Sequence, residues 1–256
     1  MIDFDWNTLA AYAAVATLAG FIDAIAGGGG LITIPALLLG QLSPIQALAT
    51  NKLQGAFGTL SSTLTQLGKR KINLRELKGA FVMSLIGAAL GTILVQTVNQ
   101  KALDIAIPIV LIAIALYFLL APKAGEVENH PRMSDTLYSR TIVPIIGFYD
   151  GFFGPGTGSF FALAGVSLRG WDLVRATGAA KVMNFASNIA SMGVFLWSGQ
   201  IVWPIGLAMM CGQAIGGYAG SIAAINGGAK FIRPIIVTVC IVMLARYAWQ
   251  KGYLGV

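Results

Sequence analysis

Ten apolar segments, separated by short polar stretches, run along the chain. They lie at residues 9–26, 31–40, 45–67, 76–98, 102–121, 141–153, 157–168, 173–197, 201–225 and 231–250. Most of them are comparable in length with the roughly 20 residues that a helix needs to cross about 30 Å of hydrocarbon. The pattern predicts an all-α, polytopic integral membrane protein with a single membrane domain over residues 1–256.

The composition agrees with a membrane protein. Of the 256 residues, 56% are hydrophobic and only 11% are charged, whereas soluble proteins carry about 25% charged residues. The first residues include Asp3 and Asp5 and no basic side chain, unlike a cleavable signal peptide, so the first apolar segment is expected to stay in the membrane. We attribute the net charge of +7 to basic cytoplasmic loops and expect no nucleic-acid partner.

Two parts of the chain resemble each other. The segment GFIDAIAGGGG at 20–30 matches GFYDGFFGPGT at 147–157, and the match places Asp23 over Asp150. A self-similarity of this kind indicates an internal duplication.

A second match extends the duplication along the chain. The segment ALATNKLQGAFGTLSS at 47–62 lies over ATGAAKVMNFASNIAS at 176–191, which aligns Lys52 with Lys181. One short insertion accounts for the two-residue change in offset between the matches. The duplication predicts repeat one at 9–121, a solvated polar linker at 122–140 and repeat two at 141–251.

Charge in the loops predicts the orientation of the two repeats. The loop GKRKINLR at 68–75 is strongly basic, whereas the corresponding loop WSGQIVWP at 197–204 carries no charge. Basic loops stay on the cytoplasmic side, so equivalent loops are expected on opposite sides of the membrane. Because each repeat has an odd number of segments, five, the second repeat is inverted relative to the first. If the N-terminus lies outside, most lysine and arginine residues lie inside.

Glycine-rich runs interrupt both repeats beside unusually short segments. The segment 31–40 covers only about 15 Å as a helix, half of the hydrocarbon. Unwound backbone is tolerated at membrane depth only where it is buried or lines a wet cavity, so we expect two facing helix–break–helix hairpins. Their helix N-termini would favour an anion, although close helix packing is an alternative role for glycine. The residues of the two breaks are Gly27, Gly28, Gly29 and Gly30, and Gly154, Pro155, Gly156 and Thr157.

Four charged residues lie inside apolar segments and form two repeat-related pairs: Asp23 with Asp150, and Lys52 with Lys181. Each such charge costs at least about 2.5 kcal/mol at the bilayer centre, so these residues are expected to face a cavity or one another. We expect the lysines to contact an anion, with snorkelling towards the interface as the alternative.

The aspartates offer a route to proton coupling, and an ion pair with a lysine or a cap on the hairpin amides is the alternative. Neutral hydrogen-bond donors near the lysines are Asn51, Gln54 and Asn184.

The sequence argues against an enzyme, a cofactor or a metal site. His130 is the only histidine, and it lies in the linker without acidic or cysteine residues at ligand spacing. Cys211 and Cys240 fall inside apolar segments, where neither a disulfide framework nor a metal-binding pair is available. A phosphate-binding loop is also disfavoured, because no Gly-Lys-Ser/Thr follows the glycines.

The sequences of the paired motifs resemble those of the TauE/SafE sulfite exporter family, and within it the YfcA-type members most of all. The resemblance rests on GFIDAIAGGGGLITIPALL with ALATNKLQG, and on GFYDGFFGPGTGSFF with ATGAAKVMNFASN. It places the glycine-rich family motifs on 27–30 and 154–158 and an AxATNK-like motif on 49–52. The second copy departs from the first, since Ala180 replaces the asparagine and Pro155 interrupts the glycines.

The resemblance implies a multi-pass transporter of the bacterial plasma (inner) membrane that moves small sulfur-containing anions such as sulfite, sulfoacetate or related organosulfonates. We expect alternating access, with the anion between the hairpins near the midplane. A passive small-anion channel and a carrier of another small organic anion are the alternatives. The expected partners are the small anionic substrate and the lipid bilayer, and the sequence is compatible with a homodimer.

Overall fold

The computed structural model describes residues 5–68, 73–120 and 130–225, together with residues 241, 242, 245 and 249. Within this part of the chain, every regular element is a helix. The helices are α1 (Trp6–Ala26), α2 (Gly30–Leu39), α3 (Pro44–Gly68), α4 (Leu74–Val95), α5 (Gln100–Leu120), α6 (Asp135–Phe152), α7 (Thr157–Arg169), α8 (Leu173–Trp197) and α9 (Trp203–Ile225). The all-α prediction is confirmed, while most of the expected segment 231–250 lies outside the described residues.

Among the described residues, four helices are long and apolar enough to cross a membrane: α1, α4, residues Gln100–Tyr117 of α5, and α9. Helices α3 and α8 each have 25 residues, but many of their polar side chains are buried inside the protein. Outward-facing positions on α4 and α5 are instead large and apolar, such as Leu90, Ile93, Ile105 and Ile109, which are 53–60% exposed. In a polytopic protein, this surface faces lipid tails.

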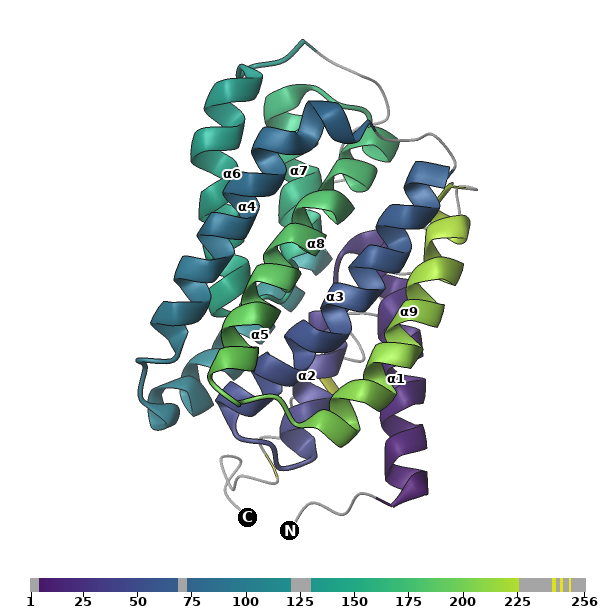
Figure 1. The fold of residues 1–256 in the computed structure, drawn as a ribbon, viewed down its shortest axis with the longest axis vertical. Helices are drawn as coiled ribbons and strands as arrows, with labels where there is room; N and C mark the ends of the chain where they lie inside the picture. Colours follow the sequence, from purple (N-terminus) through teal and green to yellow (C-terminus); the bar gives the residue numbers. More distant parts are fainter. Residues whose placement is uncertain are drawn as a thin grey trace.

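Corresponding helices of the two repeats run in opposite directions. In Figure 1, α1, α3 and α9 run upward along the sequence colours, whereas α4, α6 and α8 run downward. Helix α1 packs on α9 as α6 packs on α4, and α3 packs on α9 as α8 packs on α4. Each helix pair between the repeats therefore has a counterpart in which the two repeats have exchanged roles, as expected for inverted repeats.

Glycines set the close packing of α1 on α9. Gly212, Gly216 and Gly220 recur every four residues on α9, and their α-carbons lie against backbone carbonyls of α1. A Cβ atom on Gly216 would overlap with the carbonyl oxygen of Thr17. Small residues let membrane helices approach this closely, so these glycines serve packing.

A Gly216→Ala substitution is therefore expected to destabilise the protein by about 1–3 kcal/mol, because α1 and α9 must separate. The matched control is Gly193→Ala on α8, where an added Cβ meets nothing within 4 Å. Alanine there should leave stability unchanged or raise it slightly, because alanine favours helix. Thermal unfolding of the detergent-purified variants, followed by circular dichroism, measures both effects; equal melting temperatures would contradict this packing role.

Both expected helix–break–helix hairpins are present. Gly29, at the start of α2, lies against Asp23, whereas Gly40, just after α2, lies against Tyr12 in the first half of α1. Helix α2 therefore runs back along α1. Helix α7 runs back along α6 in the same way, since Arg169 near its end contacts Asp135 at the start of α6.

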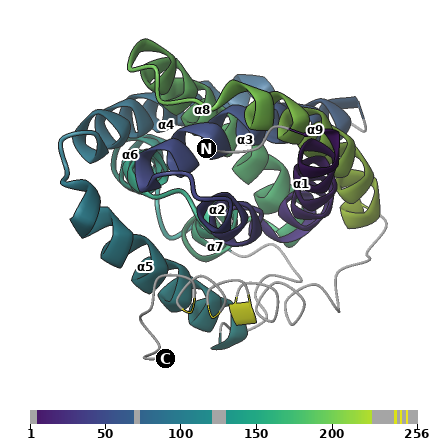
Figure 2. The ribbon, with the colours of Figure 1, turned by 90° about the horizontal axis from the view of Figure 1, so that it is seen from below.

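The tips of the two hairpins meet in the interior. Gly27 lies against Gly158 and Ser159, and Gly30 lies against Pro155. Gly27 has a φ of 74°, in the left-handed region, and has no room for a Cβ atom. In Figure 2, α2 and α7 overlap between the outer helices, with α5 along one edge, whereas in Figure 1 α7 lies above α2. The glycine-rich breaks of the two repeats are thus in contact with each other.

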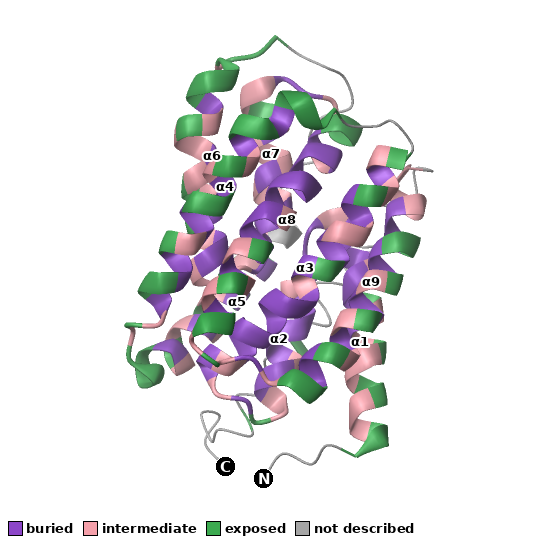
Figure 3. Ribbon diagram, in the orientation of Figure 1, coloured by how far each residue is buried: buried purple, intermediate pink, exposed green. Residues whose placement is uncertain are grey.

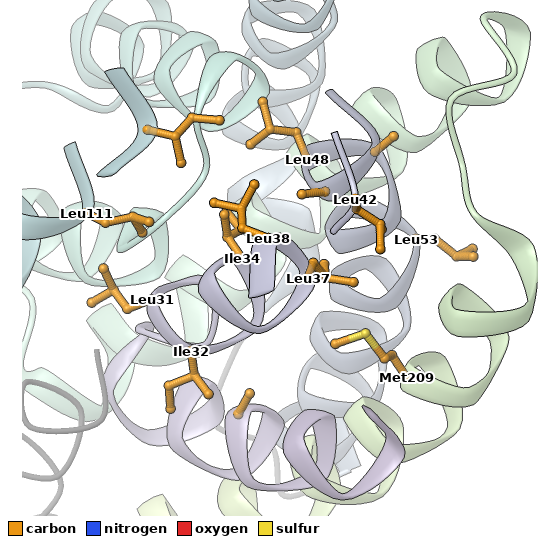
Figure 4. Close-up of a cluster of buried hydrophobic side chains, with 14 of the residues drawn as sticks. Leu31, Ile32, Ile34, Leu37, Leu38, Leu42, Leu48, Leu53, Leu111 and Met209 are labelled. Carbon is orange, nitrogen blue, oxygen red and sulfur yellow. The ribbon is translucent and has the colours of Figure 1, made fainter. Parts of the chain in front are cut away.

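Two clusters of buried apolar residues hold these helices. The larger one is built around α2, whose Leu31, Ile34, Leu37 and Leu38 are 0–3% exposed, and Figure 4 shows it. The smaller one joins α6, α7 and α8 and includes Tyr138 and other buried aromatic residues. In Figure 3, buried residues concentrate on α2, α3 and α8, between the outer helices. The hairpin tips and the central helices therefore share the protein interior.

One boundary differs from the hydropathy pattern. We expected a helical segment from residue 141, but α6 begins at Asp135 because the Ser134 hydroxyl accepts a hydrogen bond from the Leu137 amide at 3.3 Å. The last residues of the polar stretch 122–140 thus form the first turns of α6, while 121–129 lie outside the described residues.

Candidate functional site

The four charged residues of the apolar segments form two ion pairs in the interior. Lys52 Nζ on α3 lies 2.8 Å from Asp150 Oδ2 on α6, and Lys181 Nζ on α8 lies 3.1 Å from Asp23 Oδ2 on α1. Each pair joins a lysine of one repeat to an aspartate of the other. Both lysines are 1% exposed, so neither snorkels to the surface. The alternative interpretation of the aspartates, a pair with a lysine, describes their arrangement here.

Asp23 also caps the α2 hairpin. Its Oδ1 accepts a hydrogen bond from the Gly29 amide at 3.1 Å, while Lys181 donates to both its Oδ2 and its backbone carbonyl. The carboxylate stabilises the amides at the beginning of α2, and the ammonium lies at the C-terminal end of α1, where the helix dipole favours a cation. One ion pair therefore holds both sides of the first break.

Lys52 occupies a comparable position at the second break. A Cβ atom built on Gly154 would lie 3.1 Å from Lys52 Nζ, so the glycine leaves room for the ammonium. Gly154 has a φ of 93°, a conformation that glycine adopts without strain. Lys52 Nζ also donates to Asn188 Oδ1 at 3.3 Å. Each break thus lies beside a lysine that comes from the other repeat.

Neutral amides around the lysines present donors to the same region. Asn51 Oδ1 accepts hydrogen bonds from Thr33 Oγ1 at 2.6 Å and from Gln54 Nε2 at 2.9 Å. Asn184 Oδ1 accepts one from Asn188 Nδ2 at 3.1 Å. Because the carbonyl oxygens are occupied, the Nδ2 groups of Asn51 and Asn184 are left for the cavity that both side chains line.

These side chains enclose a polar cavity of about 30 Å³. It holds about two water molecules, so a multi-atom oxyanion does not fit in this conformation. The predicted site residues that line it are Asp23, Gly27, Gly30, Asn51, Lys52, Asp150, Gly154, Gly156 and Asn184. The remaining predicted residues do not line it: Lys181 lies behind Asp23, with which it pairs, and Gln54 holds Asn51 in place. The others belong to the hairpin tips: Gly28, Gly29, Pro155 and Thr157.

The structure adds four lining residues that the sequence did not single out: Gly55, Thr59, Asn188 and Gln213. A signal existed for three of them, because Gly55 and Thr59 lie three and seven residues after Lys52, and Asn188 lies seven after Lys181, on the same helix faces. Gln213 carried no such signal, since its helix has no buried charge. Gly55 and Gly58 leave room for the side chains of Asn188 and Gln213.

The lining of the cavity combines hydrogen-bond donors with two carboxylates. The ammonium group of Lys52 and the amide side chains of Asn51 and Asn184 line the cavity, while the ammonium group of Lys181 lies behind Asp23, and donors of this kind recognise negative charge. The two aspartates bring the formal charge of the cluster to zero and occupy both lysines. A ligand would contact either lysine only if the paired carboxylate moved away or took up a proton.

Comparison with known proteins identifies the group to which this chain belongs. The family model described as Sulfite exporter TauE/SafE matches residues 12–247. The chain is 47% identical over 246 residues to the probable membrane transporter protein ORF9 of Sinorhizobium sp, covering 96% of this chain and 94% of that protein. It is 44% identical over 252 residues to a probable membrane transporter protein of Haemophilus influenzae, covering 98% and 99%.

The probable membrane transporter protein YfcA of Escherichia coli K12 is 46% identical over 237 residues, covering 93% of this chain and 88% of that protein. No solved structure matches the chain at a significant level. The family match spans the hairpins, the buried ion pairs and the cavity between them. This chain therefore belongs to the TauE/SafE sulfite exporter family and is a membrane transporter, not an enzyme.

Proposed function

We propose that this transporter moves a small sulfur-containing anion, such as sulfite, sulfoacetate or a related organosulfonate, across the bacterial plasma membrane by alternating access. The observation that carries the proposal is the cluster at the hairpin tips, where Lys52 lines the cavity and Lys181 pairs with Asp23 of the lining, each lysine with 1% of its surface exposed. A buried ionisable residue in a membrane segment marks a substrate or ion pathway by default. The family description, sulfite exporter, supports the sulfur-containing cargo.

The donor set favours a small oxyanion. Lysine is a compact point charge, whereas arginine offers a planar fork that selects bidentate carboxylates and phosphates. No arginine lines the cavity, and the amides of Asn51 and Asn184 add neutral donors. Such a site recognises charge and size more than planar geometry, which suits sulfite and short sulfonates alike.

The closed cavity supports a carrier over a passive channel. A channel keeps a continuous passage, whereas this site holds about 30 Å³ and both lysines are engaged. Each ion pair crosses between repeats, so breaking one pair loosens one hairpin relative to the other. Inverted repeats provide two equivalent ways of opening, one towards each side of the membrane.

Protonation of the aspartates provides the coupling in this proposal. When Asp23 or Asp150 takes up a proton, its lysine loses its ion-pair partner and the cluster gains one positive charge. An anion then binds with its charge compensated in a region of low dielectric constant. Proton and anion move together because each makes the other's burial favourable.

A ligand screen tests the substrate class. The purified protein is heated with sulfite, sulfoacetate, taurine, thiosulfate, sulfate and short carboxylates in turn. Sulfite or a sulfonate is expected to raise the melting temperature, since a ligand at 100 times its Kd stabilises the folded state by about 2.7 kcal/mol. Stabilisation by carboxylates alone would point to the carrier of another organic anion. Flux in proteoliposomes that never saturates would point to a channel.

We also propose that the N-terminus lies outside, which places the α3–α4 connection in the cytoplasm. Arg75 lies at the beginning of α4 and Gln200 in the α8–α9 turn, at opposite ends of the molecule (Figure 1). Cysteine variants of these two residues, in a background without Cys211 and Cys240, are labelled in intact cells with an impermeant maleimide. Gln200→Cys is expected to react and Arg75→Cys is not. Labelling of both from one side would contradict the inverted topology.

A further inference from the structure

Helix α3 carries a polar face that continues beyond the cavity. Lys52, Gly55 and Thr59 line the cavity, and Thr63 and Gln66 follow at the same helical spacing. The distance along the helix from Lys52 to Gln66 is about 21 Å. Thr63 and Gln66 are 5% and 2% exposed, so this face is buried up to the last turn of α3.

Helix α9 contributes polar residues at the same level. Gln213 lines the cavity, and Ser221 lies two turns further on, towards the end of α9 that neighbours the end of α3 in Figure 1. The two helices are in close contact there, because Ser62 Oγ donates to the Gly217 carbonyl at 3.2 Å. The polar face of α3 and that of α9 therefore lead from the cavity to the same end of the molecule.

Several of these polar atoms are buried without a hydrogen-bond partner in the described part of the chain. They are Thr63 Oγ1, Gln66 Oε1, Gln213 Oε1 and Ser221 Oγ. An unsatisfied polar atom is costly inside a membrane protein, and valine or leucine would pack as well without that cost. Polar groups that this conformation does not use are explained if water or an ion contacts them in another conformation.

The second repeat differs at the corresponding positions. The alignment of the repeats places Met192 over Thr63 and Phe195 over Gln66. Phe195 is fully buried in the larger apolar cluster, and Met192 packs against that cluster. The face of α8 that leads from the cavity to the opposite end is thus closed by apolar side chains.

We propose that the α3–α9 face, formed by Thr59, Thr63, Gln66, Gln213 and Ser221, borders the aqueous passage by which the hydrated anion travels between the central site and the side of the α3–α4 connection. This inference rests on the proposed transport function. The sequence of that connection is basic, with Lys69, Arg70 and Lys71, and attracts anions to the same side. On the opposite side, Met192 and Phe195 are the barrier that must move.

Accessibility of single cysteines tests the passage. Thr63→Cys, Gln66→Cys, Met192→Cys and Phe195→Cys are made one at a time in the full chain, in a background in which Cys211 and Cys240 are alanine. The probe is 2-sulfonatoethyl methanethiosulfonate, an impermeant organosulfonate anion, added to right-side-out or inside-out vesicles. Leu64→Cys is the matched control, because Leu64 is 57% exposed on the outer, lipid-facing surface of α3.

Thr63→Cys and Gln66→Cys are expected to react about ten times faster than Met192→Cys and Phe195→Cys, because the reactive thiolate forms only where water reaches it. The reaction should occur only from the side of the α3–α4 connection. Equal rates at the aligned positions of the two repeats, or rates at 63 and 66 no higher than that of Leu64→Cys, would overturn the proposal.

A second variant guards against local distortion by cysteine. Thr63→Val with Gln66→Leu removes both unpartnered groups at nearly constant volume, so the protein is expected to unfold at the same or a higher temperature. Sulfite flux should nevertheless fall about ten-fold, because the dehydrated face no longer admits the anion. Unchanged flux overturns the passage. Fast labelling at 63 and 66 without any stabilisation by sulfur-containing anions supports the passage and rejects the substrate class.

Discussion

A Lys52→Met variant is expected to transport the anion about 100-fold more slowly than the parent protein, because the ammonium donor that lines the cavity is lost. The same change leaves Asp150 as a buried carboxylate without its cation, since the 2.8 Å ion pair disappears. Removing one partner of a buried pair costs about 3–5 kcal/mol of folding stability. Sulfite uptake into proteoliposomes and thermal unfolding measure the two effects separately.

The double variant Lys52→Met with Asp150→Asn separates stability from transport. Neutralising the carboxylate removes the uncompensated charge, so most of the lost stability should return while transport stays low. Glu76→Gln is the control for a general charge effect, because the Glu76–Arg175 pair is exposed and contributes about 0–1 kcal/mol. Parental transport by the double variant would show that Lys52 serves the fold and not the anion.

Much of the fold follows from local signals in the sequence. The duplicated motifs fix which helices correspond, and the loop charges predict that they run in opposite directions, as α3 and α8 do (Figure 1). The hairpins follow from the glycine runs, because such runs end helices and short segments cannot cross the bilayer. The start of α6 was predicted too late, since hydropathy does not register the cap supplied by Ser134.

The partners within the site depend on the three-dimensional arrangement. The sequence shows that Asp23 and Lys52 belong to one repeat, yet Asp23 pairs with Lys181 of the other repeat. This exchange arises because the tips of the two hairpins meet in the interior, so that each aspartate lies beside the lysine of the other repeat, and no local pattern records that contact. Gln213 was missed for a related reason, since only the packing of α9 on α3 brings it to the cavity.

Neutralising both aspartates, by Asp23→Asn with Asp150→Asn, is expected to abolish the coupling of transport to protons. Asparagine retains an oxygen that accepts the hydrogen bond from the Gly29 amide, so the hairpin cap can persist. The cluster then holds no carboxylate that competes with the anion for the lysines. The anion should bind about ten-fold tighter, as one added charge-assisted interaction implies, and be released slowly.

Proteoliposomes with an imposed pH gradient test this coupling directly. In the parent protein, sulfite uptake and proton flux are expected to rise together, whereas in the double variant proton flux should fall by about 100-fold, because no carboxyl group remains to carry the proton through the site. Asp135→Asn is the matched control, since its carboxylate is exposed at the start of α6, remote from the hairpin tips. Proton flux that survives the loss of both buried aspartates would assign the coupling to another group. The two ion pairs would then serve only to hold the hairpins in this conformation.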